Sequence, residues 1–292
     1  MASRGVASYN DPDRTPPTKK SMPTRFVRGF RELLSEALDS TDPASGNRLG
    51  RCIGVYAFYD YDGEPIYVGQ TTEDFATRVG RHLRGQRSDT LAYRILDPFE
   101  VADMELYPLE NLRTLPTKER NTRVDTVEYS VYVNAIRNSK YQAILNEKIP
   151  PVSPIVDLPP AQRFTLIPEE MREDREHPDV RIARRAETLA RVAAVAHERG
   201  EVSAGLRRVI VIQAVRLADL AAARLAYSEG RRRPSAEAID VPELVGSVMA
   251  ETDELTRTAA GHRADFAPLA PSPTSGNPQE EFSLDTDNSA QA

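Results

Sequence analysis

The chain has 292 residues, of which 40% are hydrophobic, and a formal net charge of −6 at pH 7. That length and apolar content can fill the core of one large or two ordinary domains. The negative charge argues against a globally basic nucleic-acid-binding protein, although an average over the whole chain does not exclude a local basic patch.

Cys52 is the single cysteine of the chain. A lone thiol forms no internal disulfide and no cysteine cluster for zinc, so any metal must be held by oxygen or imidazole ligands. The most apolar run, residues 206–226, contains arginine and aspartate residues that a bilayer core would penalise heavily. We therefore expect an intracellular, cytoplasmic protein that makes no membrane contact.

Both ends of the chain are rich in proline, serine and charge, without periodic apolar residues. Such segments cannot bury enough apolar surface to offset the entropy lost on ordering. We therefore expect a disordered N-terminal tail at residues 1–22 and a disordered acidic tail at residues 263–292.

The first predicted elements are a helix and a hairpin. Residues 24–38 have apolar side chains at helical spacing, and Asp42-Pro43 closes this helix. Residues 52–69 then alternate around Asp62-Gly63, the dipeptide that best tolerates the positive φ angles of a two-residue type I′ turn. This pattern predicts a β-hairpin.

Three further elements follow the hairpin. Apolar residues recur every four positions within residues 71–85, which predicts a helix. Residues 99–109 predict a third strand, and residues 122–138 predict another helix. The order of elements predicts an α+β fold with a small sheet flanked by helices, and we place this domain at residues 23–160.

The remainder of the chain has a different composition. Frequent prolines predict a semi-rigid linker at residues 161–178. Beyond it, residues 179–200, 203–230 and 241–261 are rich in alanine or apolar side chains at helical spacing and predict three helices. We therefore expect an all-α domain at residues 179–262, which positions substrate or forms a homodimer.

One face of the hairpin carries two phenols. With a two-residue turn, Tyr56 faces Gly69 and Phe58 faces Tyr67, so Tyr56 and Tyr67 share one surface of the sheet. Gly69 has no side chain and leaves space in front of the Tyr56 ring, an arrangement that favours a ligand over simple core packing. The hairpin is therefore a candidate half of a reaction centre.

The helix after the hairpin presents a cation and an imidazole together. Arg78 and His82 are four residues apart and lie on one helical face. Five arginines and one aspartate give residues 78–94 a local charge of +4. This basic patch consists, besides Arg78, of Arg81, Arg84, Arg87 and Arg94.

A later helix carries a carboxylate in an apolar setting. Glu128 lies between Val124 and Val131 on the predicted helical face. A carboxylate there is costly unless it is paired or bound to a metal. Glu119 is the rival carboxylate, which we disfavour because its surroundings predict a helix start or a loop.

These residues follow one another in a characteristic order along the chain: Gly54-Val55-Tyr56, Tyr67-Val68-Gly69, Arg78, His82, Glu128 and Asn146. The order resembles the GIY-YIG nucleases, whose name comes from the two tripeptides. The resemblance covers roughly residues 50–150. A single Gly-x-Tyr has no value as a signal, whereas the ordered set with compatible secondary structure is specific.

The resemblance implies a divalent-metal-dependent DNA endonuclease that hydrolyses phosphodiester bonds. In the family picture Tyr56 is the general base, and Tyr67 or His82 helps its proton loss. Arg78 would bind phosphate, Glu128 would hold one Mg²⁺ or Mn²⁺ ion, and Asn146 would orient the site. The substrate-binding candidates beside them are Gly69, Gln70, Arg81 and Arg84.

Two departures from the family pattern leave an alternative open. Many members have lysine directly after the second tripeptide, whereas this chain has Gln70. The interval from Arg78 to Glu128 also looks long, and residues 110–123 are a candidate inserted loop. The alternative function is a degenerate module that binds nucleic acid or a protein without cleavage. For an active enzyme, a restriction, defence or phage-related role is plausible by analogy.

Overall fold

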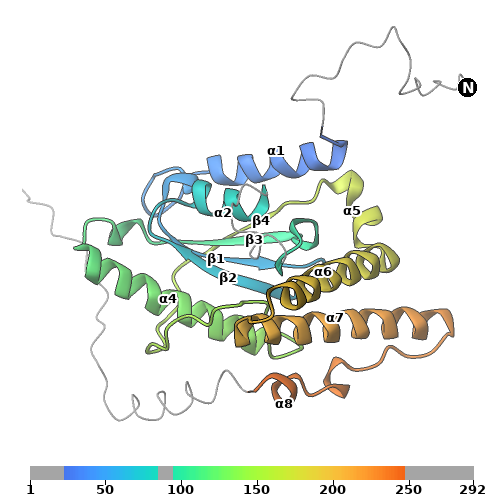
Figure 1. Cartoon of the computed structure of the whole chain (residues 1–292). Coiled ribbons are helices and arrows are strands. Elements are labelled where there is room, and N and C mark those ends of the chain that lie inside the picture. The colour runs from blue at the N-terminus through green and yellow to red at the C-terminus, as the bar shows by residue number, and fades with distance from the viewer. Residues whose placement is uncertain (1–22, 85–94, 247–292) are drawn as a thin grey trace, which may run out of the picture.

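The computed structural model describes residues 23–84 and 95–246 (Figure 1). The two predicted tails lie outside the described residues, as do Arg87 and Arg94 of the basic patch. The predicted helix at 241–261 is described only at its start, where α8 spans Val241–Val245. None of the described helices is long and apolar enough to cross a membrane.

The centre of the fold is a four-stranded antiparallel sheet in the order β2-β1-β3-β4. Its strands are β1 (Gly54–Tyr59), β2 (Pro65–Thr71), β3 (Asp103–Pro108) and β4 (Gln162–Thr165). Helices cover the sheet, so the predicted α+β class is confirmed. The hairpin and the third strand were expected, but the fourth strand was not.

The segment predicted as a linker, residues 161–178, contains regular secondary structure that the sequence did not predict. Its first part forms β4 at the sheet edge, and α5 (Glu169–Glu176) follows. Asp103 at the start of β3 holds this edge, because its carboxylate accepts hydrogen bonds from the Arg163 guanidinium at 2.9 Å and the Thr165 hydroxyl at 3.0 Å. A four-residue strand with a polar, exposed side and one partner strand leaves little periodic signal in a sequence.

The hairpin has the predicted register but not the predicted turn. Tyr56 pairs with Gly69 and Phe58 with Tyr67, while Tyr59 pairs with Pro65 through a bulge. Of the turn residues only Gly63 has a positive φ, +71°, so the turn is not type I′. The Asp60 carboxylate accepts the backbone N–H groups of Asp62 at 2.9 Å and Glu64 at 3.1 Å, and thereby stabilises a longer loop. The bulge lies beyond Phe58, so the shared face of the tyrosines is unaffected.

Helices lie against both faces of the sheet (Figure 1). One face packs against α1 (Arg25–Asp39) and α2 (Phe75–Leu83), and the other packs against α4 (Thr117–Asn138). The α4 helix begins five residues before the predicted start, so most of the candidate inserted loop is helical or a short turn. The tyrosine face of the hairpin is therefore a buried face and not an open one.

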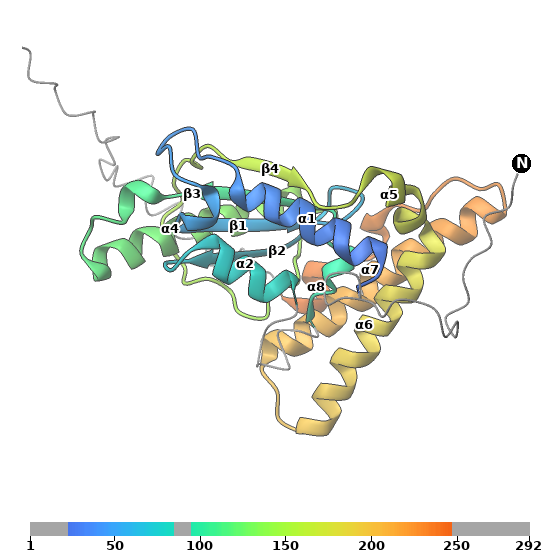
Figure 2. The same cartoon turned by 90° about the horizontal axis from the view of Figure 1, so that it is seen from above.

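Two long antiparallel helices form the C-terminal part, α6 (Pro178–Arg199) and α7 (Ala204–Ser228), as the sequence predicts. Figure 2 shows them beside the sheet. Apolar side chains of both helices, including Val192, Leu206 and Ile212, belong to the same buried cluster as the tyrosine face of the sheet. The helical part therefore shares a hydrophobic core with the sheet.

Buried charges reinforce this packing at the hairpin turn. Asp60 accepts hydrogen bonds from Arg185 at 2.9 Å and from Arg216 at 2.7 Å, and Arg185 also donates to Glu100 at 3.0 Å. Glu64 and Arg181 complete this ionic cluster, in which every member is at most 7% exposed. Three buried carboxylates thus face three buried guanidinium groups, and exposed Asp62 pairs with Arg181 at 3.0 Å from outside the cluster. Such pairing is how charges become tolerable in a protein interior.

Candidate active site

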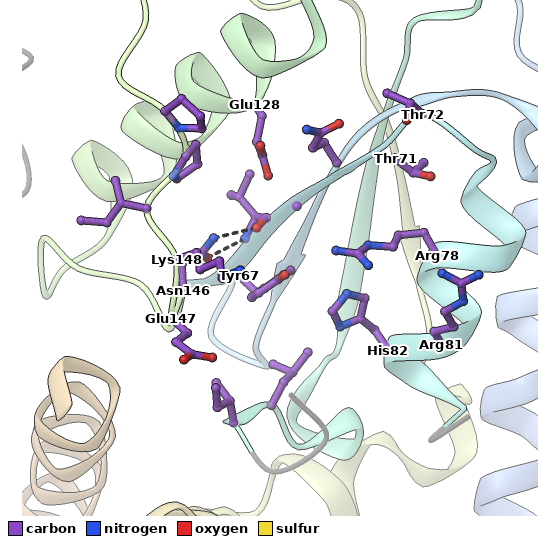
Figure 3. A pocket seen from close by; sticks show the side chains of 18 of the residues that line it. Tyr67, Thr71, Thr72, Arg78, Arg81, His82, Glu128, Asn146, Glu147 and Lys148 are labelled. Atoms are coloured by element: carbon purple, nitrogen blue, oxygen red, sulfur yellow. Dashed lines mark hydrogen bonds between the residues drawn. The ribbon is translucent and has the colours of Figure 1, made fainter. Parts of the chain in front are cut away.

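A cavity of about 940 Å³ lies between β2, α2, α4 and the loop of residues 146–151 (Figure 3). We call it the site cavity. Of the predicted site residues, Tyr56 and Arg84 do not line this cavity. The other predicted residues line it together: Tyr67, Gly69, Gln70, Arg78, Arg81, His82, Glu128 and Asn146.

Tyr56 lies behind this lining, with no exposed surface. A Cβ atom added to Gly69 would lie 2.6 Å from the Tyr56 hydroxyl, so the space in front of Gly69 is filled by Tyr56 itself and not by a ligand. Among the described residues, nothing makes a hydrogen bond of normal geometry with this hydroxyl. Burial and the neighbouring Tyr67 raise the pKa of Tyr56 well above its ordinary value, and Arg78 opposes that shift.

Tyr67 and His82 are the members of the aromatic group that line the site cavity. Their ring centroids are 5.2 Å apart, and each lies within about 6 Å of the Tyr56 ring, at 6.2 Å and 5.8 Å. Tyr67 is half-buried and lines the site cavity on β2, while His82 faces it from α2 (Figure 3). Two phenols and one imidazole therefore meet, as the hairpin register and the helical spacing predict.

Arg78 projects into the site cavity from α2. The helix is fixed by Asp74, whose carboxylate accepts the Thr77 N–H at 2.6 Å, and by the buried side chains of Phe75 and Val79. Burial disfavours the charged form of Arg78, but Tyr56, Tyr67 and Glu128 raise its pKa above the ordinary value. Its Nε is buried without a hydrogen-bond partner in the described part of the chain. Arg78 is therefore a permanent cation whose Nε–H group can still donate a hydrogen bond to a ligand.

Glu128 projects from α4 on the opposite side of the cavity (Figure 3). Burial and nearby Asp125 raise its pKa to about 7, although Arg78 acts in the other direction. Within residues 23–84 and 95–246, no group donates a hydrogen bond to this carboxylate. By contrast, Glu119 is exposed and pairs with Arg123 at 2.8 Å. The sequence-based preference for Glu128 over Glu119 thus agrees with where the two side chains lie.

The donor set fits one type of metal site. No group of three or more potential ligands occurs among the described residues, so an all-protein cage is not available there. Mg²⁺, however, is commonly held by one or two carboxylates together with water and substrate phosphates. A mostly enclosed carboxylate without a partner, at the edge of a large cavity, matches that requirement.

Asn146 has a defined structural task. Its side-chain oxygen accepts the Val68 N–H at 3.0 Å, and its amide donates to the Val68 carbonyl at 2.8 Å. These bonds occupy the free edge of β2 between Tyr67 and Gly69. Asn146 therefore fixes the loop of residues 146–151 against the strand that carries the site.

Gln70 reveals a residue that sequence reasoning missed. Its amide donates to Asp125 Oδ1 at 2.7 Å, and Asp125 lies one helical turn before Glu128. The three-residue spacing from Glu128 on α4 was the available signal. The position where many family members have lysine is therefore occupied by a neutral donor that faces a carboxylate.

The remaining candidate cations differ in placement. Arg81 pairs with exposed Glu73 at 3.3 Å at the rim of the site cavity. Arg84 follows the last turn of α2 and lies outside the lining. Two cations that the sequence did not single out, Lys148 and Arg199, do line the cavity.

Comparison with known proteins supports the family resemblance for part of the chain. Residues 52–112 match the family model of the GIY-YIG catalytic domain, so the resemblance is confirmed over the hairpin, α2 and β3. This match supports a nuclease of the GIY-YIG type. Glu128 and Asn146 lie beyond the matched segment. No curated protein and no solved structure matches the chain.

Proposed function

We propose that the protein is a divalent-metal-dependent DNA endonuclease that hydrolyses phosphodiester bonds in the site cavity. One observation carries the proposal: Arg78 and Glu128 face the same cavity from opposite sides, and neither forms an ion pair with a described residue. A phosphodiester substrate needs a cation to bind its phosphate, and a divalent metal ion needs a carboxylate ligand. The bound phosphate would thus pair with Arg78, and the bound metal ion would pair with Glu128.

Arg78 would bind a non-bridging oxygen of the scissile phosphate. A guanidinium is planar and permanently charged, so it can stabilise the extra negative charge of the pentacovalent transition state. Its burial strengthens this interaction because little water screens the charge. Arg78 and the attacked phosphate would therefore lie on the α2 side of the cavity.

The proton acceptor is better placed at Tyr67 than at Tyr56, the base expected from the sequence. Tyr67 lines the cavity beside His82, whereas the Tyr56 hydroxyl is shielded behind Gly69. A phenol has an ordinary pKa near 10 and can accept a proton only where positive charge favours phenolate. Arg78 supplies such charge, and Tyr56 would act indirectly by positioning Arg78 and Tyr67.

Glu128 would hold the metal, one Mg²⁺ or Mn²⁺ ion, at the α4 side of the cavity. When bound, such an ion neutralises charge on the phosphate and lowers the pKa of a coordinated water. Asn146 would keep the β2 edge and the adjoining loop in register with these groups. Gly69, Gln70 and Arg81 would lie along the substrate path.

The proposed biological setting, a restriction, defence or phage-related role, rests on analogy. The catalytic module offers little surface for selecting a DNA site, so a restriction, defence or phage-related role would draw on the helical part as well. Dimerisation through that part also stays a prediction, which light scattering would test.

A catalytically degenerate module is the second candidate function. Gln70 favours it, because the neutral amide replaces a cation found in many family members and is engaged with Asp125. Such a protein would bind nucleic acid or a protein partner in the site cavity and leave it intact.

Incubation of the purified protein with plasmid and branched DNA, in Mg²⁺ or EDTA, tests the proposal. We expect DNA cleavage in Mg²⁺ and not in EDTA. The variants Tyr67→Phe, Arg78→Ala and Glu128→Gln should lose most of this cleavage activity. Tyr56→Phe should lose less activity than Tyr67→Phe. Glu119→Gln is the matched control, because it removes an exposed carboxylate from the same helix. Binding without cleavage of any substrate would favour the degenerate module, and equal cleavage by all variants would contradict the site.

A further inference from the structure

We propose that a second wall of the site cavity binds the nucleic-acid backbone beyond the scissile phosphate, through Lys148 and Arg199. This wall consists of the loop of residues 146–151 and the last turn of α6. The inference rests on the proposed function and extends it to residues outside the segment that matches the family model. It assigns part of the substrate contact to the helical part of the chain.

The two cations are available for a ligand. Lys148 and Arg199 are exposed, and both line the same cavity as Arg78. Neither has a carboxylate within salt-bridge distance in the described part of the chain, in contrast to Arg81, which pairs with Glu73. Side chains with free positive charge on both sides of one cavity suit a polyanion that places several phosphates there.

The carboxylates that line the site cavity form no ion pair with Lys148 or Arg199. Glu147 accepts a hydrogen bond from the Ser203 hydroxyl at 2.8 Å, and Glu73 is engaged with Arg81. Glu128 lies on the α4 side of the cavity and is assigned to the metal (Figure 3). Glu147 keeps its negative charge, but Lys148 and Arg199 form no ion pair with it and remain available to the phosphates of a strand that leaves the reaction centre.

The wall is also held rigidly by α7. Arg208 donates to the backbone carbonyls of Asn146 at 3.3 Å and Glu147 at 3.2 Å. Gly205 lies so close that an added Cβ would be 1.8 Å from the Glu147 carbonyl oxygen. Since Ser203 caps α7 and also bonds Glu147, the turn between α6 and α7 and the loop of residues 146–151 are connected. Pre-positioned cations lose less entropy when they bind phosphate.

Salt-dependent DNA binding tests the wall without requiring catalysis. Fluorescence anisotropy in EDTA would give the dissociation constant of a labelled duplex at several salt concentrations. For duplex DNA each lost phosphate contact lowers the slope of log K against log salt by about 0.9. We expect Lys148→Ala/Arg199→Ala to lower the slope by nearly two and to weaken binding about tenfold or more at low salt. Arg199→Lys should retain most of the slope.

The matched controls are Arg191→Ala and Lys118→Ala. Arg191 is exposed on the same helix and pairs with Glu187, and Lys118 is exposed at the start of α4; neither lines the cavity. A double variant with the wild-type slope, or with no greater loss than the controls, would overturn the inference.

Cleavage by the wild type, measured in parallel, separates this inference from the proposed function. If the wild type cleaves DNA and the double variant keeps the wild-type slope, the inference about the wall is wrong and the proposed nuclease function stands. If the double variant has a reduced slope and the wild type cleaves no DNA, the inference about the wall stands and the proposed nuclease function is wrong. A wild-type protein that binds no nucleic acid overturns both.

Discussion

The two ends of the β1–β2 hairpin carry polar side chains in opposite circumstances. At the turn, Asp60 is buried and accepts hydrogen bonds from Arg185 and Arg216. Toward the other end, Tyr56 and Tyr67 lie beside Arg78 and across the site cavity from Glu128, and neither of these two charges has an ion-pair partner among the described residues. The same pair of strands thus supports one cluster of ion-paired charges and one group of charges without ion pairs.

This difference separates stability from function within one small sheet. A buried charge with ion-pair partners stabilises the fold, because removal of one partner leaves another charge poorly compensated. Charges without partners around a cavity cost stability, and sites that bind charged ligands commonly carry this cost. We therefore expect variants of the ionic cluster to lose stability and variants of the site cavity to lose activity.

The largest expected effect is on the ionic cluster. Asp60→Ala would leave Arg216 without its hydrogen-bonded carboxylate and Arg185 with Glu100 as its remaining hydrogen-bonded carboxylate, and we expect it to lower the free energy of unfolding by about 3–5 kcal/mol. Urea denaturation followed by circular dichroism measures this loss. A decrease below about 1 kcal/mol, the usual value of an exposed ion pair, would show that the cluster contributes little.

Arg78→Ala should have the next largest effect, and it should appear in catalysis. Loss of one positioned donor to a transition-state oxyanion typically lowers kcat by about 10²–10³. Arg78→Lys should recover little, since an ammonium does not reproduce the planar fork of the guanidinium. Single-turnover cleavage provides the rate, and urea denaturation serves as the control for folding. Near wild-type rates for both variants would remove Arg78 from the reaction.

Glu128→Gln should stabilise the metal-free protein at high pH. The pKa of Glu128 is raised from 4.5 to about 7, so the folded state binds a proton that the unfolded state releases. The wild type therefore loses stability relative to the Gln variant as pH rises from about 4.5 to 7, and the difference stays on the order of 1–3 kcal/mol above that. Unfolding in EDTA at pH 5 and pH 8 measures it. The expectation would be wrong if the variant were less stable at pH 8.

Asn146→Ala should have a smaller effect on stability. It removes two hydrogen bonds to the Val68 backbone, and an unpaired buried group costs about 1–3 kcal/mol. Asn146→Asp is the matched comparison because it retains an acceptor for the Val68 N–H but loses the donor. If both variants matched the wild type in stability and in cleavage rate, Asn146 would not hold the loop.

The smallest effect should come from an exposed pair on α6. Arg191 and Glu187 form an ion pair in which both side chains are about half exposed. Glu187→Gln should lower the free energy of unfolding by about 0.2–1 kcal/mol, as is usual for surface pairs. This variant sets the baseline against which the Asp60 variant is judged. Equal losses at the two positions would contradict the contrast between the two clusters.

Local patterns predicted the parts of the site that lie close together in the sequence. Alternation along residues 54–69 was sufficient to pair Tyr56 with Gly69, because the bulge falls beyond Phe58. The four-residue interval between Arg78 and His82 likewise placed both toward the site cavity. The order of motifs then pointed to Glu128 and Asn146 on more distant elements, and both line the cavity.

Long-range packing accounts for what the sequence did not predict. Asp60 meets Arg216 across 156 positions of the chain, and no periodicity indicates which of many arginines will be its partner. The edge strand β4 is short and polar, and the proline-rich sequence around it favours the interpretation as a linker. Lys148 reaches the cavity on a loop that Arg208 of α7 holds, and Arg199 reaches it from the last turn of α6. Each of these features depends on tertiary contacts and not on local propensity.

The Mg²⁺-dependent cleavage rate of Glu128→Gln tests the account most directly. The substitution keeps the shape of the side chain and removes the charge that would hold the metal. We predict that the wild type cleaves DNA with a saturable dependence on Mg²⁺ and that the folded variant does not cleave at any Mg²⁺ concentration. Cleavage by the variant at the wild-type rate would contradict the assignment of the site cavity as a metal-dependent active site.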